Sequence, residues 1–203
     1  MAKVIVENNF DELHFLKQAE NFQLVYLFSD QPIEFESKNI IEVDKKITFK
    51  KDVSDAFNDA GIQIYSGLLT DNLLQLAFQS GEYSRFKTDP RLSGEEFKSL
   101  YKIWISKALT TRSLLVTEDQ SGMITFTISG EYLNIGLIAV EQHGRGKGIG
   151  KKLMRAVEQK AVELGIKYIV VPTQENNISA CKFYQSLGYL EVEKTYVYHW
   201  WRQ

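Results

Sequence analysis

The chain has 203 residues, with 24 Lys and Arg against 26 Asp and Glu, so its formal net charge at pH 7 is −2. This balance excludes the strong positive field of a typical nucleic-acid-binding protein, and 44% hydrophobic residues exclude a largely disordered chain. One cysteine, Cys181, and three scattered histidines predict neither a disulfide nor a metal site. Apolar runs are no longer than strands and the first residues do not resemble a signal peptide, so we expect a cytoplasmic protein that does not cross a membrane.

The first 70 residues predict a small α/β module, separate from the rest of the chain. One helical stretch spans residues 10–19, and no cluster of reactive side chains accompanies it. Short β-rich runs occupy residues 4–6, 23–28, 40–43, 47–49 and 62–65.

Residues 71–203 predict a larger second domain. An apolar helix ends near Gly81, and a second, amphipathic helix extends to about residue 109 behind a capping box of Ser93 and Glu96. Three closely spaced strands follow, at 113–117, 123–128 and 132–140, and their short connections predict antiparallel hairpins.

The last third of the chain alternates helices with strands. A glycine-rich turn opens an amphipathic helix that ends at Gly165, and a continuous apolar run at 166–171 predicts a buried strand. A shorter helix at 177–187 leads to one or two final strands within residues 189–201. The aromatic residues at 196–201 could form a dimer strand, stack on a nucleotide base or fill the core.

The turn His143-Gly-Arg-Gly-Lys-Gly-Ile-Gly150 lies between a predicted strand and a predicted helix. Unpaired N–H groups at a helix start, together with the helix dipole and nearby cations, favour an anion such as a pyrophosphate. Neither the P-loop spacing nor the dinucleotide-binding spacing fits this turn. The spacing that fits is Arg145-x-x-Gly148-x-Gly150, although an ordinary tight strand-to-helix turn is the alternative.

Two motifs in order resemble the GNAT superfamily of acyl-CoA N-acyltransferases. The first is the Arg145-x-x-Gly148-x-Gly150 turn, and the second is Asn177-x-x-Ala180-x-x-x-Tyr184, followed by Leu-Gly-Tyr at 187–189. The resemblance implies an α/β (α+β) fold with a central, mixed, mostly antiparallel sheet flanked by helices. It also implies acetyl-CoA as the acyl donor, without a metal.

By this resemblance, Tyr184 is the general acid that protonates the departing thiolate, since its reference pKa of about 10 lies above the roughly 8.5 of a thiol. Plain packing is the alternative for Tyr184, and helix capping is the alternative for Asn177. The candidate general bases are Glu118, Glu131 and Asn134, and the sequence assigns this role to none of them. The residues implied to bind the acyl donor are Ile138, Ala139, Val140, Arg145, Gly146, Lys147, Gly148, Ile149, Gly150, Lys151 and Asn177.

The loop at 84–91 and the helix after it resemble the acetyltransferases of TDP-linked 4-amino-4,6-dideoxy sugars such as TDP-fucosamine, which tend to be homodimers. Tyr83, Ser84 and Arg85 are then implied to bind the acceptor, with the Arg85 guanidinium on a diphosphate. Arg85 could instead pair with Asp89 and hold the loop. The remaining alternatives are another acceptor (a polyamine, an antibiotic or a protein amine) and a non-catalytic module that binds acyl-CoA.

Overall fold

The computed structural model describes residues 2–6, 10–53 and 61–203. Its helices are α1 (Glu12–Ala19), α2 (Asp71–Ser80), α3 (Arg85–Thr88), α4 (Gly94–Thr110), the 3-10 helix η1 (Gln142–Gly144), α5 (Ile149–Glu163) and α6 (Ile178–Ser186). Its strands are β1 (Ala2–Ile5), β2 (Leu24–Ser29), β3 (Ile40–Asp52), β4 (Ile62–Ile64), β5 (Leu114–Thr117), β6 (Gly122–Ser129), β7 (Tyr132–Val140), β8 (Tyr168–Gln174) and β9 (Leu190–Trp201).

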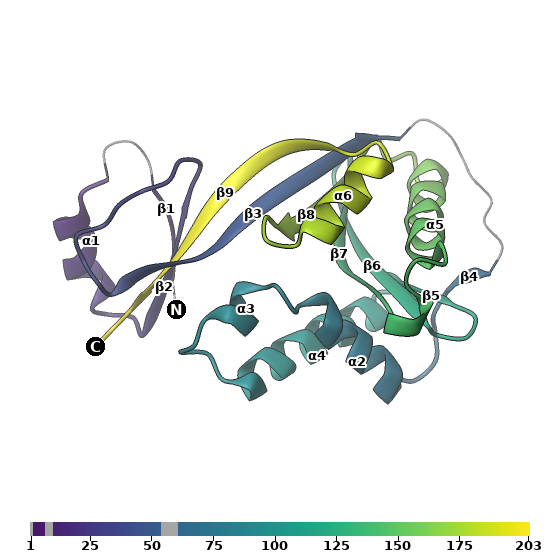
Figure 1. Cartoon of the computed structure of the whole chain (residues 1–203), viewed down its shortest axis with the longest axis horizontal. Helices are drawn as coiled ribbons and strands as arrows, with labels where there is room; N and C mark the ends of the chain where they lie inside the picture. The colour runs from purple at the N-terminus through teal and green to yellow at the C-terminus, as the bar shows by residue number, and fades with distance from the viewer. Residues whose placement is uncertain (1, 7–9, 54–60) are drawn as a thin grey trace.

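These nine strands form one mixed sheet in the order β1-β2-β9-β3-β8-β7-β6-β5-β4 (Figure 1). The β1–β2 and β7–β8 pairs are parallel, and the other pairs are antiparallel. The mixed, mostly antiparallel sheet predicted from the sequence is therefore confirmed. The β5–β6–β7 hairpins are confirmed as well.

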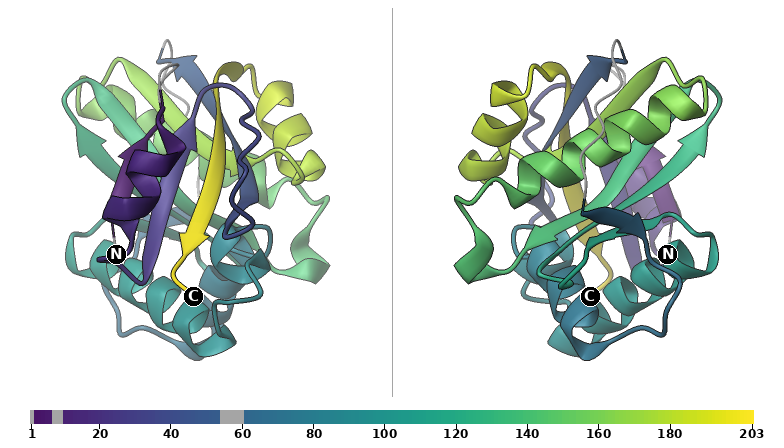
Figure 2. Two further views of the ribbon diagram at one scale, coloured as in Figure 1. Left: turned by 90° about the vertical axis from the view of Figure 1, so that its left-hand side faces the viewer. Right: turned by 90° about the vertical axis from the view of Figure 1, so that its right-hand side faces the viewer.

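Helices cover both faces of the larger part of this sheet (Figure 2). Side chains alternate between the two faces of a strand, so Leu115 faces α5 while its neighbours Leu114 and Val116 face α2 and α4. From α5, Leu153 and Val157 are fully buried in the first of these two cores. No helix in the described parts of the chain is long and apolar enough to cross a membrane.

The capping residues in the sequence predicted several helix ends correctly. The Ser93 hydroxyl accepts a hydrogen bond from the Glu96 amide at 3.2 Å, and the Ser93 amide donates to the Glu96 carboxylate at 2.7 Å, which completes the capping box of α4. Gly165 follows α5 at φ +66°. The loop expected after Gly81 contains the short helix α3, which no periodic pattern indicated.

The N-terminal segment and the rest of the chain share the sheet. Where the sequence indicated two short runs, β3 is a single strand with a register shift between Glu42 and Asp44. This strand pairs with β9 along one edge and β8 along the other. The division at residue 70 thus does not divide the sheet.

The C-terminal strand β9 is part of the smaller lobe of Figure 1, which also contains α1, β1 and β2. Tyr198 and Trp200 are buried there beside Val25 and Leu27. Residues 196–201 of β9 lie between β2 and β3 and have no free edge, so the alternative of a dimer strand at 196–201 is wrong. Core packing is the correct interpretation of Tyr198 and Trp200.

Candidate functional site

A cavity of about 770 Å³ opens where β7 and β8 diverge. β7 pairs with β8 only from Tyr132 to Asn134, so the later part of β7 has a backbone edge that β8 does not cover. Ile138, Ala139 and Val140 line the cavity on this side, while residues from the end of α2, the start of α5 and α6 complete it.

The glycine-rich turn provides free backbone donors to this cavity. Gly146 and Gly148 have φ angles of +75° and +83°, which glycine adopts without strain. The first hydrogen bond into α5 runs from the Lys152 amide to the Gly148 carbonyl at 3.1 Å. The amides of Gly148, Ile149 and Gly150 have no acceptor among the described residues, so they are available to an anion at the positive end of the helix dipole.

Close packing supports the shape of the turn. A Cβ on Gly150 would lie 3.2 Å from the Phe183 ring, so α5 and α6 approach closely at this point. The Arg145 Nε donates to the Val140 carbonyl at 3.1 Å, which fixes the loop against the end of β7. Of the residues predicted to bind the acyl donor, all except Lys147 line the cavity.

Tyr184 from α6 lines the same cavity although its side chain is only 3% exposed. The rings of Phe49, Phe183 and Tyr189 surround it at centroid distances of 5.4–6.2 Å. Its hydroxyl makes no hydrogen bond to a described residue, and burial, with a smaller contribution from Cys181, raises its pKa well above the ordinary value. Tyr184 is therefore both packed in the core and a protonated donor at neutral pH.

Asn177 caps α6 and lines the cavity. Its Oδ1 accepts hydrogen bonds from the Ala180 amide at 3.2 Å and the Ser179 hydroxyl at 3.0 Å. The capping role is confirmed, and these contacts use only the oxygen of the side-chain amide.

The three residues predicted to bind the acceptor take different positions. Tyr83 lines the cavity and is 47% exposed, whereas Ser84 is buried at the start of α3. Arg85 is not among the residues that line the cavity. Its guanidinium carbon lies 4.4 Å from the centre of the Phe86 ring and 5.3 Å from that of Tyr26.

The alternative pairing of Arg85 with Asp89 is wrong. The Asp89 Oδ2 lies 2.5 Å from the Nδ1 of His199 and accepts from the Trp201 Nε1 at 3.0 Å. Asp89 therefore anchors the α3–α4 connection to β9 and makes no ion pair with Arg85.

Sequence reasoning missed several residues that line the cavity. Glu82 is the most notable of them, because it brings an exposed carboxylate next to Tyr83. None of Glu118, Glu131 and Asn134 lines the cavity. Each missed residue is a near neighbour in sequence of a residue that was predicted to belong to the site, and this closeness was the signal that could have found it. The missed residues are Gln79, Ser80, Glu82, Gln142, Gly144, Ser179, Ala180 and Phe183.

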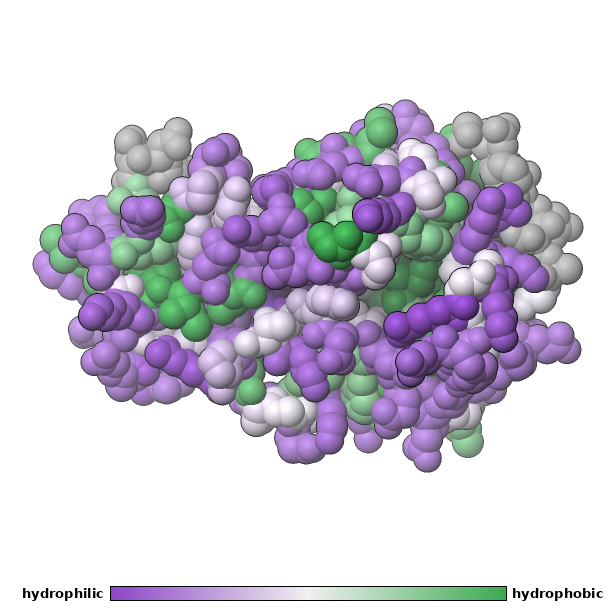
Figure 3. Space-filling model, in the orientation of Figure 1, coloured by the Kyte–Doolittle hydropathy of each residue, from purple (hydrophilic) through white to green (hydrophobic). Residues whose placement is uncertain are grey.

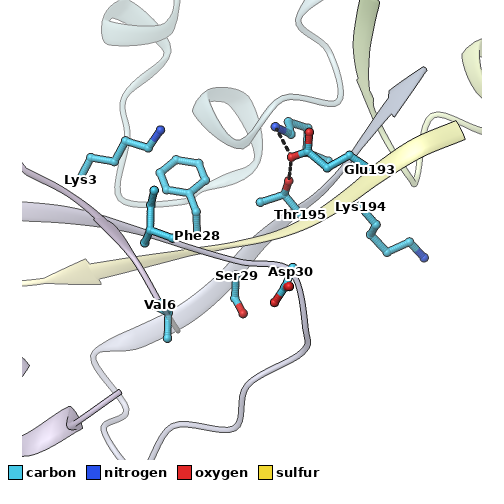
Figure 4. A pocket seen from close by; sticks show the side chains of 10 residues that line it. Lys3, Val6, Phe28, Ser29, Asp30, Glu193, Lys194 and Thr195 are labelled. Atoms are coloured by element: carbon cyan, nitrogen blue, oxygen red, sulfur yellow. Dashed lines mark hydrogen bonds and ion pairs between the residues drawn. The ribbon is translucent and has the colours of Figure 1, made fainter. Parts of the chain in front are cut away.

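A second cavity, of about 660 Å³, lies where β2 ends beside β3 and β9 (Figure 4). Lys46 and Glu193 in its lining pair with each other: the Glu193 carboxylate lies 3.4 Å from the Lys46 Nζ and accepts from the Thr195 hydroxyl at 2.6 Å. Lys194 pairs with Glu175, outside the cavity lining. The face in Figure 3 is mostly hydrophilic, with smaller hydrophobic areas on the left-hand lobe and in the hollow right of centre.

The model of the Acetyltransferase (GNAT) family matches residues 71–189, which is more than half of the chain. The chain belongs to this family. A conserved protein of Staphylococcus epidermidis, described as functionally unknown, has the same fold, with a TM-score of 0.69 over 98% of this chain and 84% of that one at 12% identity. The fold likeness thus includes the N-terminal lobe as well as the GNAT part.

Two curated relatives are similar in sequence. The spore coat polysaccharide biosynthesis protein SpsD of Bacillus subtilis is 23% identical over 137 residues, which cover 65% of this chain and 47% of SpsD. A probable spermine N(1)-acetyltransferase of Bacillus subtilis subsp. natto is 41% identical over 51 residues, which cover 25% of this chain and 34% of that protein. This GNAT chain therefore spans less than half the length of these two relatives.

Proposed function

We propose that this GNAT chain is an N-acetyltransferase that uses acetyl-CoA to acetylate the amine of a small molecule. One observation carries the proposal: the residues with free amides at the start of α5, the uncovered edge of β7 and Tyr184 all line one cavity. Together they provide an anion site, backbone donors for an extended arm and a proton donor. A pyrophosphate-bearing thioester needs all three.

Acetyl-CoA supplies the acetyl group as an activated thioester. The amides of Gly148, Ile149 and Gly150 hold the pyrophosphate at the helix start, with Arg145 and Lys151 adding positive charge. Backbone groups of residues 138–140 bind the pantetheine arm and polarise the thioester carbonyl. Tyr184 donates its proton to the sulfur as the thiolate leaves.

The acceptor amine attacks directly, without an acyl-enzyme, and the proton that its nitrogen loses returns through solvent to Tyr184. Cys181 is the chain's single thiol, and burial raises its pKa. Its sulfur lies 3.7 Å from the Gln174 carbonyl, and it does not line the cavity. A thiol in this state is a poor nucleophile.

For the acceptor, we infer a nucleotide-linked amino sugar. SpsD, by its name, acts in polysaccharide biosynthesis, and the Arg85 side chain is suited to a diphosphate. A polyamine is the second candidate, because of the similarity to the spermine acetyltransferase. Glu82 is the one carboxylate among the described cavity residues, so this lining lacks the cluster of acidic side chains that a polycation would favour.

The test follows thiol release from acetyl-CoA with TDP-linked amino sugars, spermidine and peptide amines. Tyr184→Phe should lower kcat by roughly 100-fold or more while the Kd for CoA changes less than about threefold, because only the proton donor is lost. Tyr189→Phe is the matched control: this neighbouring tyrosine bonds Glu158 at 3.1 Å away from the cavity, so kcat should stay within about twofold. CoA binding without thiol release from any acceptor would instead support a non-catalytic binding module.

A further inference from the structure

Glu82 differs in chemistry from every other titratable side chain in the described lining of the 770 Å³ cavity. The others are Tyr83, Arg145, Lys151 and Tyr184, and the described lining contains no histidine and no aspartate. Phenols and cations hold their protons at neutral pH, whereas a carboxylate is ionised and accepts only. Among these side chains, Glu82 is therefore the one that can take a proton from an acceptor.

The carboxylate of Glu82 is unoccupied by any described residue. It makes no hydrogen bond and no ion pair within the parts of the chain that the structure describes. The residue is exposed, so a proton that it accepts can pass on to solvent. Glu131, a base considered from the sequence, instead pairs with Lys167 and does not line the cavity.

Packing fixes the turn that carries Glu82. A Cβ on Gly81 would lie 2.2 Å from Cζ of the Tyr101 ring, so the end of α2 lies directly against α4. The Glu82 amide donates to the Gln79 carbonyl at 3.3 Å, and the Ser84 amide donates to the Gly81 carbonyl at 2.9 Å. These contacts hold the backbone at residue 82 in one position beside the cavity.

The turn and Tyr184 reach the cavity from opposite faces of the sheet. On β7, Ala139 packs in the core formed with α2, whereas Ile138 and Val140 pack against the core that contains Tyr184. The uncovered edge of β7 therefore lies between the side that carries Glu82 and the side that carries the proton donor. An amine that attacks a carbonyl at this edge, and a sulfur that leaves it, can each have a proton-transfer group of its own.

We propose that Glu82 binds the amine of the acceptor and acts as its general base. As the lone pair of the amine forms the C–N bond, the nitrogen becomes acidic and the Glu82 carboxylate takes one of its protons. The C–S bond breaks, its electron pair leaves with the sulfur, and Tyr184 protonates that sulfur. The proton on Glu82 passes to solvent, from which Tyr184 regains its own. This inference deepens the proposed acetyl transfer and rests on it for the reaction.

The kinetic test uses the amine of the panel above that gives the highest kcat/KM. Glu82→Gln should lower kcat roughly 100-fold, while the KM for acetyl-CoA changes less than about threefold, because only the proton acceptor is lost. Glu82→Asp keeps a carboxylate and should retain more activity than Glu82→Gln. Glu118→Gln is the matched control, since Glu118 is an exposed glutamate that does not line the cavity, and its kcat should stay within about twofold.

Added formate distinguishes a lost proton acceptor from a disturbed turn. Glu82→Ala leaves space for a small carboxylate, so formate should raise its kcat by roughly fivefold or more. The wild type and Glu82→Gln should not respond, because their own side chains fill the position. A Glu82→Ala enzyme that formate does not activate would count against the role of general base.

Binding measured by calorimetry with CoA present separates this inference from the proposed activity. The probes are glucosamine and glucose, which differ in the amine. The wild type should bind glucosamine roughly fivefold or more tightly, and Glu82→Gln should abolish this preference. If the preference depends on Glu82 but no amine of the panel releases thiol, Glu82 remains the amine-binding residue and acetyl transfer is rejected. If thiol release survives Glu82→Gln with kcat within about threefold, the acetyltransferase stands and the role of Glu82 is overturned.

Discussion

Gly146 and Gly148 show how much of the site could be predicted from single residues. Their spacing ahead of a helix indicated an anion-binding turn. The free amides at the start of α5 and the positive φ angles of both glycines agree with this prediction. The aromatic surroundings of Arg85 could not be predicted in the same way. Tyr26 and Phe28, whose rings lie beside its guanidinium, come 59 and 57 residues earlier on β2.

Replacement of Gly148 by alanine tests the turn at this scale. At φ +83° a Cβ costs about 1 kcal/mol of stability, and the backbone relaxes in a way that turns the amides of α5 away from the cavity. We expect the KM for acetyl-CoA to rise roughly 10-fold through the loss of a charge-assisted hydrogen bond.

Gly130 provides the matched control for that variant. It has φ +57° in the β6–β7 turn and does not line the cavity. Gly130→Ala should therefore lower the urea midpoint by a similar amount and leave the KM unchanged. An unchanged KM in Gly148→Ala would show that these amides do not bind the donor.

Single elements were harder to predict wherever charged residues interrupt an apolar pattern. The run Asp44-Lys45-Lys46 divides β3 into two apparent strands in the sequence. In the structure, β9 pairs with all three charged residues and β8 pairs from Lys46 onward, so the strand continues through the charged run. Helices with periodic apolar faces and caps, such as α4, needed no such neighbours and were predicted correctly.

The contact between Asp89 and His199 links the α3–α4 connection to β9 and gives this link a pH dependence. Both side chains are at most 1% exposed. Burial lowers the pKa of His199 despite the opposing effect of Asp89. Burial acts to raise the pKa of Asp89, but hydrogen bonds from His199, Arg91 and Trp201 outweigh it and hold that pKa below the ordinary value.

Because the folded pKa of His199 is lowered, its contribution to stability is complete above the unfolded pKa of about 6.5 and is lost as the pH falls below it. The unfolding free energy should therefore decrease between pH 7 and pH 5, by at most about 1.4 kcal/mol per pH unit from this group. His199→Gln should be about 3 kcal/mol less stable at pH 7, since it leaves Asp89 buried without its partner, and should show a shallower slope.

Urea titrations of the wild type and His199→Gln across this pH range measure the difference. The Asp44 carboxyl, with its pKa raised to about 6, contributes with the opposite sign, but it is present in both proteins and cancels in the subtraction. Parallel curves for the two proteins would contradict the role given to His199.

At the scale of the whole molecule, the two lobes are interleaved. β3 starts in the N-terminal lobe and ends between β8 and β9, while β9 returns to the N-terminal lobe (Figure 1). The C-terminal Tyr198 and Trp200 complete the core beside Val25 and Leu27. No local pattern contains the pairing of β2 with β9, which joins residues more than 160 positions apart, so the sequence suggested two modules instead.

This interleaving predicts that the chain unfolds as one cooperative unit. Trp200 and Trp201 report on β9, and Trp104 reports on α4, where its ring packs against Phe86 and Tyr101. In Trp104→Phe, and separately in the double variant Trp200→Phe/Trp201→Phe, the urea transitions by fluorescence and far-UV circular dichroism should coincide, because removal of either lobe takes strands from the shared sheet. An earlier fluorescence transition in Trp104→Phe would mean that the N-terminal lobe unfolds first and that the shared sheet does not couple the two lobes.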